Sequence, residues 1–123
     1  MRSEEKLATR SVLIVDDDRN LTKLVSTVLA LAGLNVLTAS DGLAALNLLN
    51  GQEVDVIILD LRMPRMDGRT FLKELREKGK DTPVLIASAY GARAAQRELG
   101  AQAAIEKPFD PQRLLDVVTE LLA

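Results

Sequence analysis

Residues 56–68 have the sequence VIILDLRMPRMDG, in which four aliphatic residues lead directly into Asp60 and then into a loop that contains Pro64 and Gly68. An unbroken aliphatic run is typical of a strand buried on both faces, as in a parallel sheet. Ligands of such sheets bind beyond the carboxyl ends of the strands, so this stretch predicts that Asp60 stands in a binding crevice. Taken alone, Asp60 is as well explained as a cap of the loop, because Asp is common where a strand turns.

Short apolar runs alternate with segments of helical periodicity on both sides of this stretch. The predicted strands cover residues 12–15, 35–38, 56–59, 83–87 and 103–105. Helices are predicted to begin near Asp18, Asp41, Asp67 and Asp110, with a further one over residues 92–99. Five strands alternating with five helices in one short chain predict right-handed βαβ units and an α/β fold, an open and doubly wound parallel sheet with helices on both faces.

The segment at 92–99 has the weakest apolar face among the predicted helices. It offers little more to a core than Ala94, Ala95 and Leu99. Because burial of an apolar face provides most of a helix's stability in a protein, we expect this helix to be the least firmly anchored.

Composition limits the chemistry that the chain can perform. Its 123 residues suit one domain, and the core must consist of Leu, Val, Ile and Ala because only 2% of the residues are aromatic. The sequence has no His and no Cys, which excludes His-activated nucleophiles, a phosphohistidine, disulfides and thiolate metal sites. A net charge of -2 without a basic cluster gives no basis for direct nucleic-acid binding.

We expect residues 1–10 to form a flexible N-terminal tail and residues 11–123 to form the domain. The first ten residues hold no apolar segment of the kind found in signal peptides, and no later apolar run is long enough to cross a bilayer. The sequence therefore predicts a cytoplasmic protein without membrane insertion.

Three carboxylates follow predicted strands that should be neighbours. Asp16 and Asp17 follow the first strand, and Asp60 follows the third. In a doubly wound sheet the ends of these two strands lie side by side, so the three side chains are expected to share one pocket. Such a cluster is costly unless a cation occupies it, and oxygen ligands without His or Cys favour Mg²⁺. A purely structural role as a helix start explains Asp18 well but leaves the preceding pair unexplained.

The fourth and fifth predicted strands end in two further groups that suit an anion. Ser88 follows the fourth strand, and Lys107 follows the fifth directly before Pro108. Each residue alone is weak support, because such a Ser usually bonds its local backbone and such a Lys is usually a solvated charge. Their joint placement with the carboxylates at one edge of one sheet predicts a single site.

The segments VLIVDDD, IILDLRMPRMDG, LIASAYG and AIEKPFD resemble the receiver domains of two-component response regulators. The resemblance covers about residues 11–122, and its motifs are specific in combination. It implies a flavodoxin-like three-layer sandwich with a five-stranded parallel sheet of order 2-1-3-4-5. It also implies a cis peptide bond between Lys107 and Pro108.

The resemblance assigns a role to each residue of the predicted site. Asp60 would accept a phosphoryl group from the phosphohistidine of a partner histidine kinase or histidine phosphotransfer protein. Asp16 and Asp17 would hold Mg²⁺ together with Asp60, Ser88 would bond a phosphoryl oxygen, and Lys107 would pair with that oxygen or with the Asp60 carboxylate. The chain would then be a phosphorylation-controlled switch in signal transduction, a regulatory protein that catalyses only its own phosphorylation and dephosphorylation.

One position departs from the family pattern. An aromatic residue usually lies three positions before the site Lys, and this chain has Ala104 there, so the usual coupling of that ring to the site cannot operate. Tyr90 either takes over this role, screens the phosphoryl group from water, or simply packs on the surface. Arg62, two positions after Asp60, is a second residue that could change the access of water to the acyl phosphate.

The output of the switch is expected to pass to another protein, because no further domain follows the last predicted helix. The resemblance suggests a partner face on the fourth helix, fifth strand and fifth helix of the family fold, with Arg93, Arg97, Gln102 and Arg113, although ordinary solvated charges also explain these residues. The same sequence would fit a stand-alone protein or the head of a longer regulator.

Two other functions remain open at this stage. A phosphatase of the haloacid dehalogenase type would use Asp16 as its nucleophile, since residues 12–18 also present an aliphatic strand followed by Asp-x-Asp, although Asn20 departs from that motif and Asp60 would have no role. A non-phosphorylated interaction domain is the second alternative.

Overall fold

The structure is a computed structural model that describes residues 10–123. Five strands and five helices alternate along these residues. The strands are β1 (Ser11–Val15), β2 (Asn35–Ala39), β3 (Val56–Leu59), β4 (Val84–Ser88) and β5 (Ala103–Glu106). The helices are α2 (Arg19–Leu31), α3 (Gly42–Leu49), α4 (Gly68–Glu77), α5 (Ala92–Leu99) and α6 (Pro111–Leu122). The predicted alternation is confirmed, with boundaries that shift by one or two residues.

All five strands are parallel and form one sheet of order β2-β1-β3-β4-β5. The doubly wound topology is therefore confirmed. Strands β1 and β3 pair with Val15 opposite Leu59, and the Asp60 amide donates to the Val15 carbonyl at 2.9 Å. This register places the residues that follow both strands next to each other at the carboxyl edge of the sheet.

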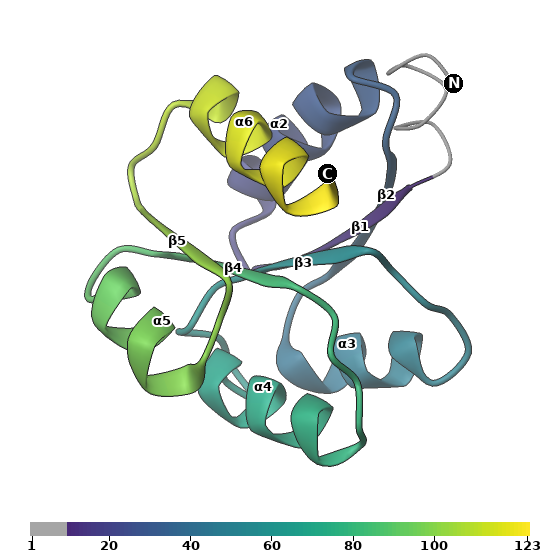
Figure 1. The fold of residues 1–123 in the computed structure, drawn as a ribbon, viewed down its shortest axis with the longest axis vertical. Coiled ribbons are helices and arrows are strands. Elements are labelled where there is room, and N and C mark those ends of the chain that lie inside the picture. The colour runs from purple at the N-terminus through teal and green to yellow at the C-terminus, as the bar shows by residue number, and fades with distance from the viewer. Residues whose placement is uncertain (1–9) are drawn as a thin grey trace.

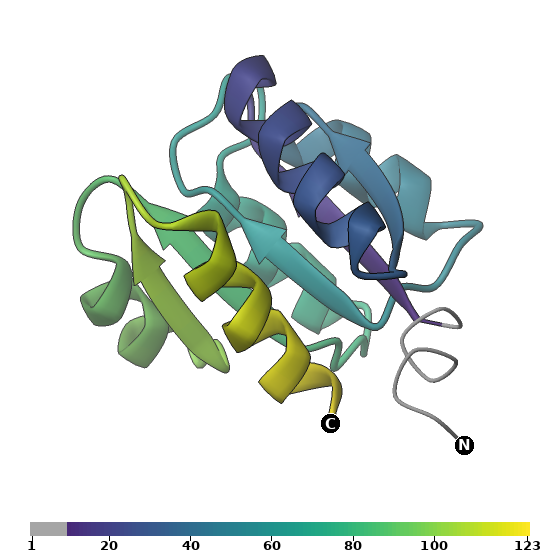
Figure 2. The ribbon, with the colours of Figure 1, turned by 90° about the horizontal axis from the view of Figure 1, so that it is seen from above.

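Helices cover both faces of the sheet and give the molecule three layers. Helices α2 and α6 lie on one face, and α3, α4 and α5 lie on the other (Figure 1). Figure 2, seen from above, shows α2 and α6 side by side over the strands. The arrangement follows from right-handed crossovers, which place a helix on one face or the other according to the direction of the next strand.

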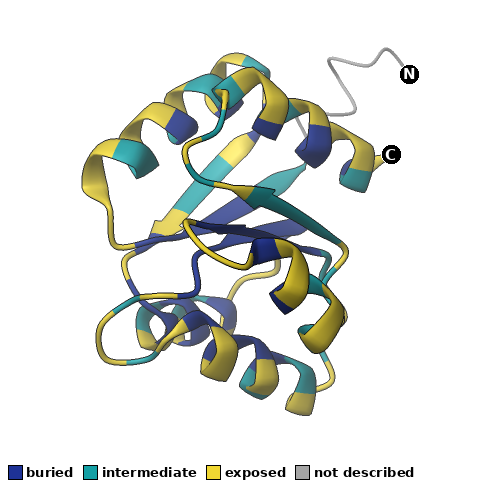
Figure 3. Ribbon diagram, turned by 90° about the vertical axis from the view of Figure 1, so that its left-hand side faces the viewer, coloured by how far each residue is buried: buried dark blue, intermediate teal, exposed yellow. Residues whose placement is uncertain are grey.

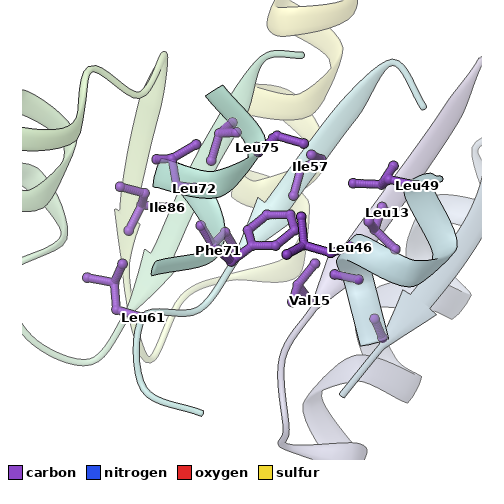
Figure 4. Packing of buried hydrophobic residues seen from close by; sticks show 14 of the residues in the cluster. Leu13, Val15, Leu46, Leu49, Ile57, Leu61, Phe71, Leu72, Leu75 and Ile86 are labelled. Atoms are coloured by element: carbon purple, nitrogen blue, oxygen red, sulfur yellow. The ribbon is translucent and has the colours of Figure 1, made fainter. Parts of the chain in front are cut away.

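A separate apolar core fills the space on each face of the sheet. The larger one lies under α3 and α4, where the ring of Phe71 is fully buried and points between the helices and the strands (Figure 4). The second core joins the other face of the sheet to α2 and α6 through residues such as Val25 and Leu114. The central strands contribute to both cores, as their unbroken aliphatic runs predict. Figure 3 shows these strands fully buried between helices whose outer sides are exposed.

Side-chain caps fix the start of four helices. The carboxylates of Asp18, Asp41, Asp67 and Asp110 each accept a hydrogen bond from a backbone amide two or three residues further on. Helix α5 has no side-chain cap and begins after Gly91 at a φ of +68°. Its buried residues are Ala92 and Ala95, whereas Ala94 is exposed, so the prediction that Ala94 faces the core is wrong.

The predicted tail of residues 1–10 lies outside the described residues except for Arg10. The Arg10 carbonyl accepts from the Asn35 amide at 3.0 Å, and its Nη1 donates to the Leu122 carbonyl at 3.0 Å. These bonds join the first described residue to β2 and to the end of α6. Within residues 10–123, no helix combines the length and apolar character needed to cross a membrane.

Candidate functional site

Three carboxylates meet at the carboxyl edge of the sheet. Asp16 and Asp17 follow β1, and Asp60 follows β3, so the pairing of these strands brings them together. One oxygen from each lies within 4.8 Å of the other two. Asp16 and Asp60 are buried and Asp17 is exposed. The convergence predicted from strand order alone is therefore found.

Lys107 joins this cluster from the end of β5. Its Nζ lies 2.7 Å from Asp16 Oδ2 and 3.6 Å from Asp60 Oδ2. The Lys107 amide donates to the Ser88 carbonyl at 2.9 Å, and the peptide bond to Pro108 is cis, as expected. The backbone at the end of β5 is thus fixed to the end of β4, and it directs the ammonium group into the acidic pocket.

Ser88 is the last residue of β4, and its side chain lies in the interior at the same edge. It is 3% exposed and pairs with Glu106 of β5, the residue before Lys107. The structure therefore places all five predicted site residues at the carboxyl ends of neighbouring strands, as expected for a doubly wound sheet.

The environment of Asp60 makes its charge unfavourable. Burial raises the pKa of the Asp60 carboxyl, and the nearby Asp16 carboxylate raises it further. Lys107 and the amides of Leu61 and Arg62 oppose this rise of the pKa only in part. The Leu61 amide donates to Asp60 Oδ1 at 2.9 Å.

The residues present fit a divalent cation. Lys107 pairs with Asp16 and Asp60 but the cluster holds three carboxylates, so negative charge remains in excess. Burial, and then the neighbouring Asp16 carboxylate, raise the pKa of Asp60. All the acidic donors are hard oxygens, which suit Mg²⁺. Asp17 faces solvent, which leaves room for the water molecules that Mg²⁺ usually retains.

The β3–α4 loop, residues 60–67, contains contacts that the sequence did not reveal. Gly68 packs against the Asp60 backbone so closely that a Cβ atom would lie 2.2 Å from the Asp60 carbonyl oxygen. The sequence predicted only that a helix begins near Asp67. Asp67 is the N-cap of α4. Position 68 requires glycine because the Asp60 backbone leaves no room there for a Cβ atom. A second contact, between Asp41 and Arg65, had no local signal because the residues are 24 positions apart.

Two exposed side chains from the segments that follow β3 and β4 lie near each other. The guanidinium of Arg62, two residues after Asp60, lies 5.6 Å from the ring centre of Tyr90, two residues after Ser88. This is a cation–π distance. Tyr90 is 74% exposed, so its ring does not pack in the interior.

The four residues of the expected partner face do not lie in equivalent surroundings. Arg93 and Arg113 line a surface hollow of about 320 Å³ together with Ala104, Ile105 and Glu106. Arg97 is exposed on α5. The Gln102 side-chain oxygen instead accepts from the Val84 amide at 2.8 Å, at the opposite end of the sheet from Lys107. A structural role therefore explains Gln102.

Comparisons with known proteins agree with this geometry. Residues 12–119 match the family described as the response regulator receiver domain. The chain is 42% identical over 114 residues to the transcriptional regulatory protein CpxR of Klebsiella pneumoniae, covering 90% of this chain and 48% of that protein.

Two solved structures have a similar fold. The receiver domain of the Francisella response regulator 1452 has a TM-score of 0.86 and 34% identity, with 92% of this chain and 96% of that one covered. The chemotaxis protein CheY4 of Vibrio cholerae has a TM-score of 0.84 and 35% identity, with 91% and 98% covered. The chain spans less than half the length of the first curated relatives that it matches.

Proposed function

The chain belongs to the response regulator receiver domain family of two-component systems, and on this premise we propose that Asp60 is its phosphoryl acceptor. A partner phosphohistidine protein, either a histidine kinase or a histidine phosphotransfer protein, supplies the phosphoryl group. The Asp60 carboxylate attacks phosphorus, the bond to the histidine nitrogen breaks, and the product is an acyl phosphate that water later hydrolyses. The chain contains no His and therefore cannot supply the donor itself.

The observation that carries this proposal is the position of Lys107 between two buried carboxylates. Its Nζ is within hydrogen-bond distance of Asp16 but 3.6 Å from Asp60 Oδ2. A charged group held beside the acceptor oxygen, rather than bonded to it, is suited to neutralising charge that arrives with a phosphoryl group. Ser88, at the end of the adjacent strand, supplies a hydroxyl for one of the phosphoryl oxygens.

Receiver domains bind Mg²⁺ in an acidic pocket, and in this chain Asp16, Asp17 and Asp60 would hold the ion. When bound, the ion offsets negative charge on the transferred phosphoryl oxygens. The protein's own contribution is to orient the Asp60 carboxylate and to limit the rise in its pKa that burial and Asp16 cause. The Leu61 amide and Lys107 act in this direction by opposing the rise in the pKa of Asp60.

The geometry favours Asp60 over Asp16 as the nucleophile. Asp16 accepts a hydrogen bond through each of its oxygens, from the Asp18 amide at 2.9 Å and from Lys107 at 2.7 Å. Asp60 accepts one through Oδ1, and Oδ2 lies beyond hydrogen-bond distance of Lys107. Each oxygen of Asp16 thus already accepts a hydrogen bond, whereas Asp60 Oδ2 is not bonded to Lys107. This argues against the phosphatase alternative, which needs Asp16 to attack.

The downstream partner is proposed to be a protein that binds the surface formed by α5, β5 and α6. Arg93, Arg97 and Arg113 remain candidates for this contact, and Gln102 is the weakest of the four for the reason given above. The chain acts as a regulatory protein, and its only catalysis is its own phosphorylation and dephosphorylation. A cytoplasmic location stays a prediction.

Intact-mass spectrometry after incubation with Mg²⁺ and phosphoramidate tests the proposal. We expect a phosphoryl adduct on the wild type that is absent from Asp60→Asn and from wild type treated with EDTA. Asp55→Asn is the control, since Asp55 bonds the Ser11 amide away from the site and should leave the adduct unchanged. An unmodified wild type, or an adduct that survives Asp60→Asn, would support a non-phosphorylated interaction domain or another acceptor.

A further inference from the structure

Arg65 has an unusual backbone conformation in the β3–α4 loop. Its φ is +63°, and among residues 10–123 it is the only residue other than glycine with a positive φ. The Met66 amide donates to the Pro64 carbonyl at 2.7 Å, which makes Arg65 the middle residue of a tight three-residue turn. An L side chain adopts this conformation at a cost in free energy, so contacts elsewhere must hold it.

The contact that holds Arg65 comes from Asp41 at the start of α3. Arg65 Nε donates to Asp41 Oδ2 at 2.7 Å, and Nη2 bonds the same oxygen. The other oxygen, Oδ1, accepts from the Ala44 amide at 2.8 Å and caps the helix. Asp41 therefore binds both elements: Oδ1 caps α3, and Oδ2 binds Arg65 of the β3–α4 loop.

The Arg65–Asp41 pair differs from a surface ion pair because its carboxylate is buried. The Asp41 side chain is 3% exposed, whereas that of Arg65 is 61% exposed. The Ala44 amide, and then the Arg65 guanidinium, hold the pKa of Asp41 below its usual value, so the carboxylate stays charged at neutral pH. A buried carboxylate requires such partners, and without Arg65 it would keep only its helix-capping bonds.

The loop and α3 are also in direct backbone contact beside this pair. The Gly42 amide donates to the Met66 carbonyl at 3.0 Å, and a Cβ on Gly42 would come within 2.8 Å of that carbonyl oxygen. At the other end of the loop, the Gly68 amide donates to the Leu61 carbonyl at 3.0 Å. The loop that begins with Asp60 is thus held at its base by Gly68 and at its tip by α3.

We propose that the Arg65–Asp41 pair is a positioning device for the phosphoryl acceptor. It holds the tip of the β3–α4 loop against α3 and thereby keeps Asp60 in register with Asp16 and Asp17 for Mg²⁺ binding and phosphoryl transfer. Both residues lie outside the carboxylate cluster, so they act through the loop. The inference rests on the proposed acceptor role of Asp60, but its first readout below does not depend on phosphorylation.

Three variants separate the ion pair from the backbone strain. Arg65→Ala removes the pair and keeps a side chain at positive φ, whereas Arg65→Gly removes the pair and relieves the strain. Asp41→Asn retains an oxygen that can cap α3 but loses the charge that binds Arg65. Arg69→Ala is the matched control, because it removes an exposed ion pair with Glu98 beyond the loop.

The first readout is amide hydrogen exchange at Leu61, Met66 and Gly68 in metal-free protein. We expect faster exchange in all three variants and wild-type exchange in Arg69→Ala. The second and third readouts are the Kd for Mg²⁺ and the rate constant of phosphorylation by phosphoramidate. In the three variants the Kd for Mg²⁺ should rise, and the rate constant of phosphorylation should fall, by roughly three- to tenfold. The double variant of Asp41 and Arg65 should show no larger change than either single variant, because both substitutions remove the same pair.

The outcomes distinguish the possible explanations. A pair with only a structural role would lower the unfolding midpoint while leaving the Mg²⁺ affinity of the folded protein unchanged, and that result would overturn the proposal. Wild-type loop exchange in Arg65→Gly and Asp41→Asn would overturn it as well. A wild type that is not phosphorylated at Asp60 would refute the proposed function, whereas the exchange data would still decide whether the pair holds the loop.

Discussion

At the scale of single residues, the site holds three carboxylates and one ammonium group, so its charges do not cancel. Lys107 contacts Asp16 at 2.7 Å and stands 3.6 Å from Asp60, while Asp17 faces solvent. Burial and the neighbouring Asp16 carboxylate raise the pKa of Asp60, so its ionised form is disfavoured. The protein keeps this unfavourable arrangement at the place where a bound cation would relieve it.

We expect Asp60→Asn to raise the free energy of unfolding by about 1 kcal/mol in EDTA at neutral pH, because it removes a buried charge next to Asp16. The carboxyl of Asp60 titrates above the ordinary Asp pKa in the folded state. Wild-type stability should therefore fall, relative to the variant, as pH rises from the ordinary Asp pKa through the raised one. Urea unfolding of both proteins across this pH range measures the difference.

Added Mg²⁺ should reduce or reverse the advantage of Asp60→Asn, since the ion favours the charged form of Asp60. A wild type that is at least as stable as Asp60→Asn in EDTA at neutral pH would contradict this account of the site's electrostatics.

The contact between Arg62 and Tyr90 is predicted to lengthen the life of the acyl phosphate by hindering the approach of water. Loss of either side chain should speed dephosphorylation about two- to fivefold, as expected for a weak exposed cation–π contact. Tyr90→Phe keeps the ring and should remain near the wild-type rate. The decay of phosphorylated protein after removal of the donor gives these rates, and unchanged rates in Arg62→Ala and Tyr90→Ala would refute the role.

At the scale of elements, local signals were sufficient for some features of the structure and insufficient for others. The caps at Asp18, Asp67 and Asp110 were predictable because a cap depends on residues two or three positions away. The buried face of α5 was predicted incorrectly at Ala94, because a run of small residues lacks the apolar contrast that marks a face. The contact of Arg65 with Asp41 joins two loops distant in sequence, and only the folded chain reveals it.

Gly68→Ala is expected to destabilise the fold by about 2 kcal/mol or more, because its Cβ would collide with the Asp60 carbonyl and neither backbone can move freely. Gly51→Ala is the matched control, since a Cβ there meets no atom within 4 Å and its φ is not in the left-handed region. That change should be neutral or slightly stabilising. Chemical denaturation compares the two, and equal stabilities would show that the β3–α4 loop accommodates the added methyl group.

Helix α5 is predicted to open more often than α4. It buries only Ala92 and Ala95 and lacks a side-chain cap, whereas α4 buries Phe71, Leu72 and Leu75. Amide hydrogen exchange should therefore be faster along α5 at the same pH and temperature. Equal protection of the two helices would mean that contacts of α5 with β4 and β5 outweigh its weak apolar face.

At the scale of the whole molecule, the topology explains why the site could be predicted while its supports could not. A parallel, doubly wound sheet brings the carboxyl ends of β1, β3, β4 and β5 to one edge, so residues that follow those strands must meet there. Their convergence follows from strand order. The lateral supports of the β3–α4 loop depend on the packing of α3 beside α4, which strand order does not determine.

Phosphorylation adds about two negative charges at this edge. In this chain the response cannot pass through an aromatic at position 104, because Ala104 occupies that place beside Arg93 and Arg113. Two links that lead from Asp60 toward the surface are Lys107 at the end of β5 and the β3–α4 loop with its contact to α3.

Mapping the phosphoryl group by borohydride reduction tests the central claim most directly. Borohydride converts an aspartyl phosphate into homoserine, and peptide mass spectrometry then identifies the modified position. After incubation with phosphoramidate and Mg²⁺, we predict homoserine at residue 60 and its absence when EDTA is present. Homoserine at residue 16, or at no Asp at all, would contradict the assignment of Asp60 as the phosphoryl acceptor.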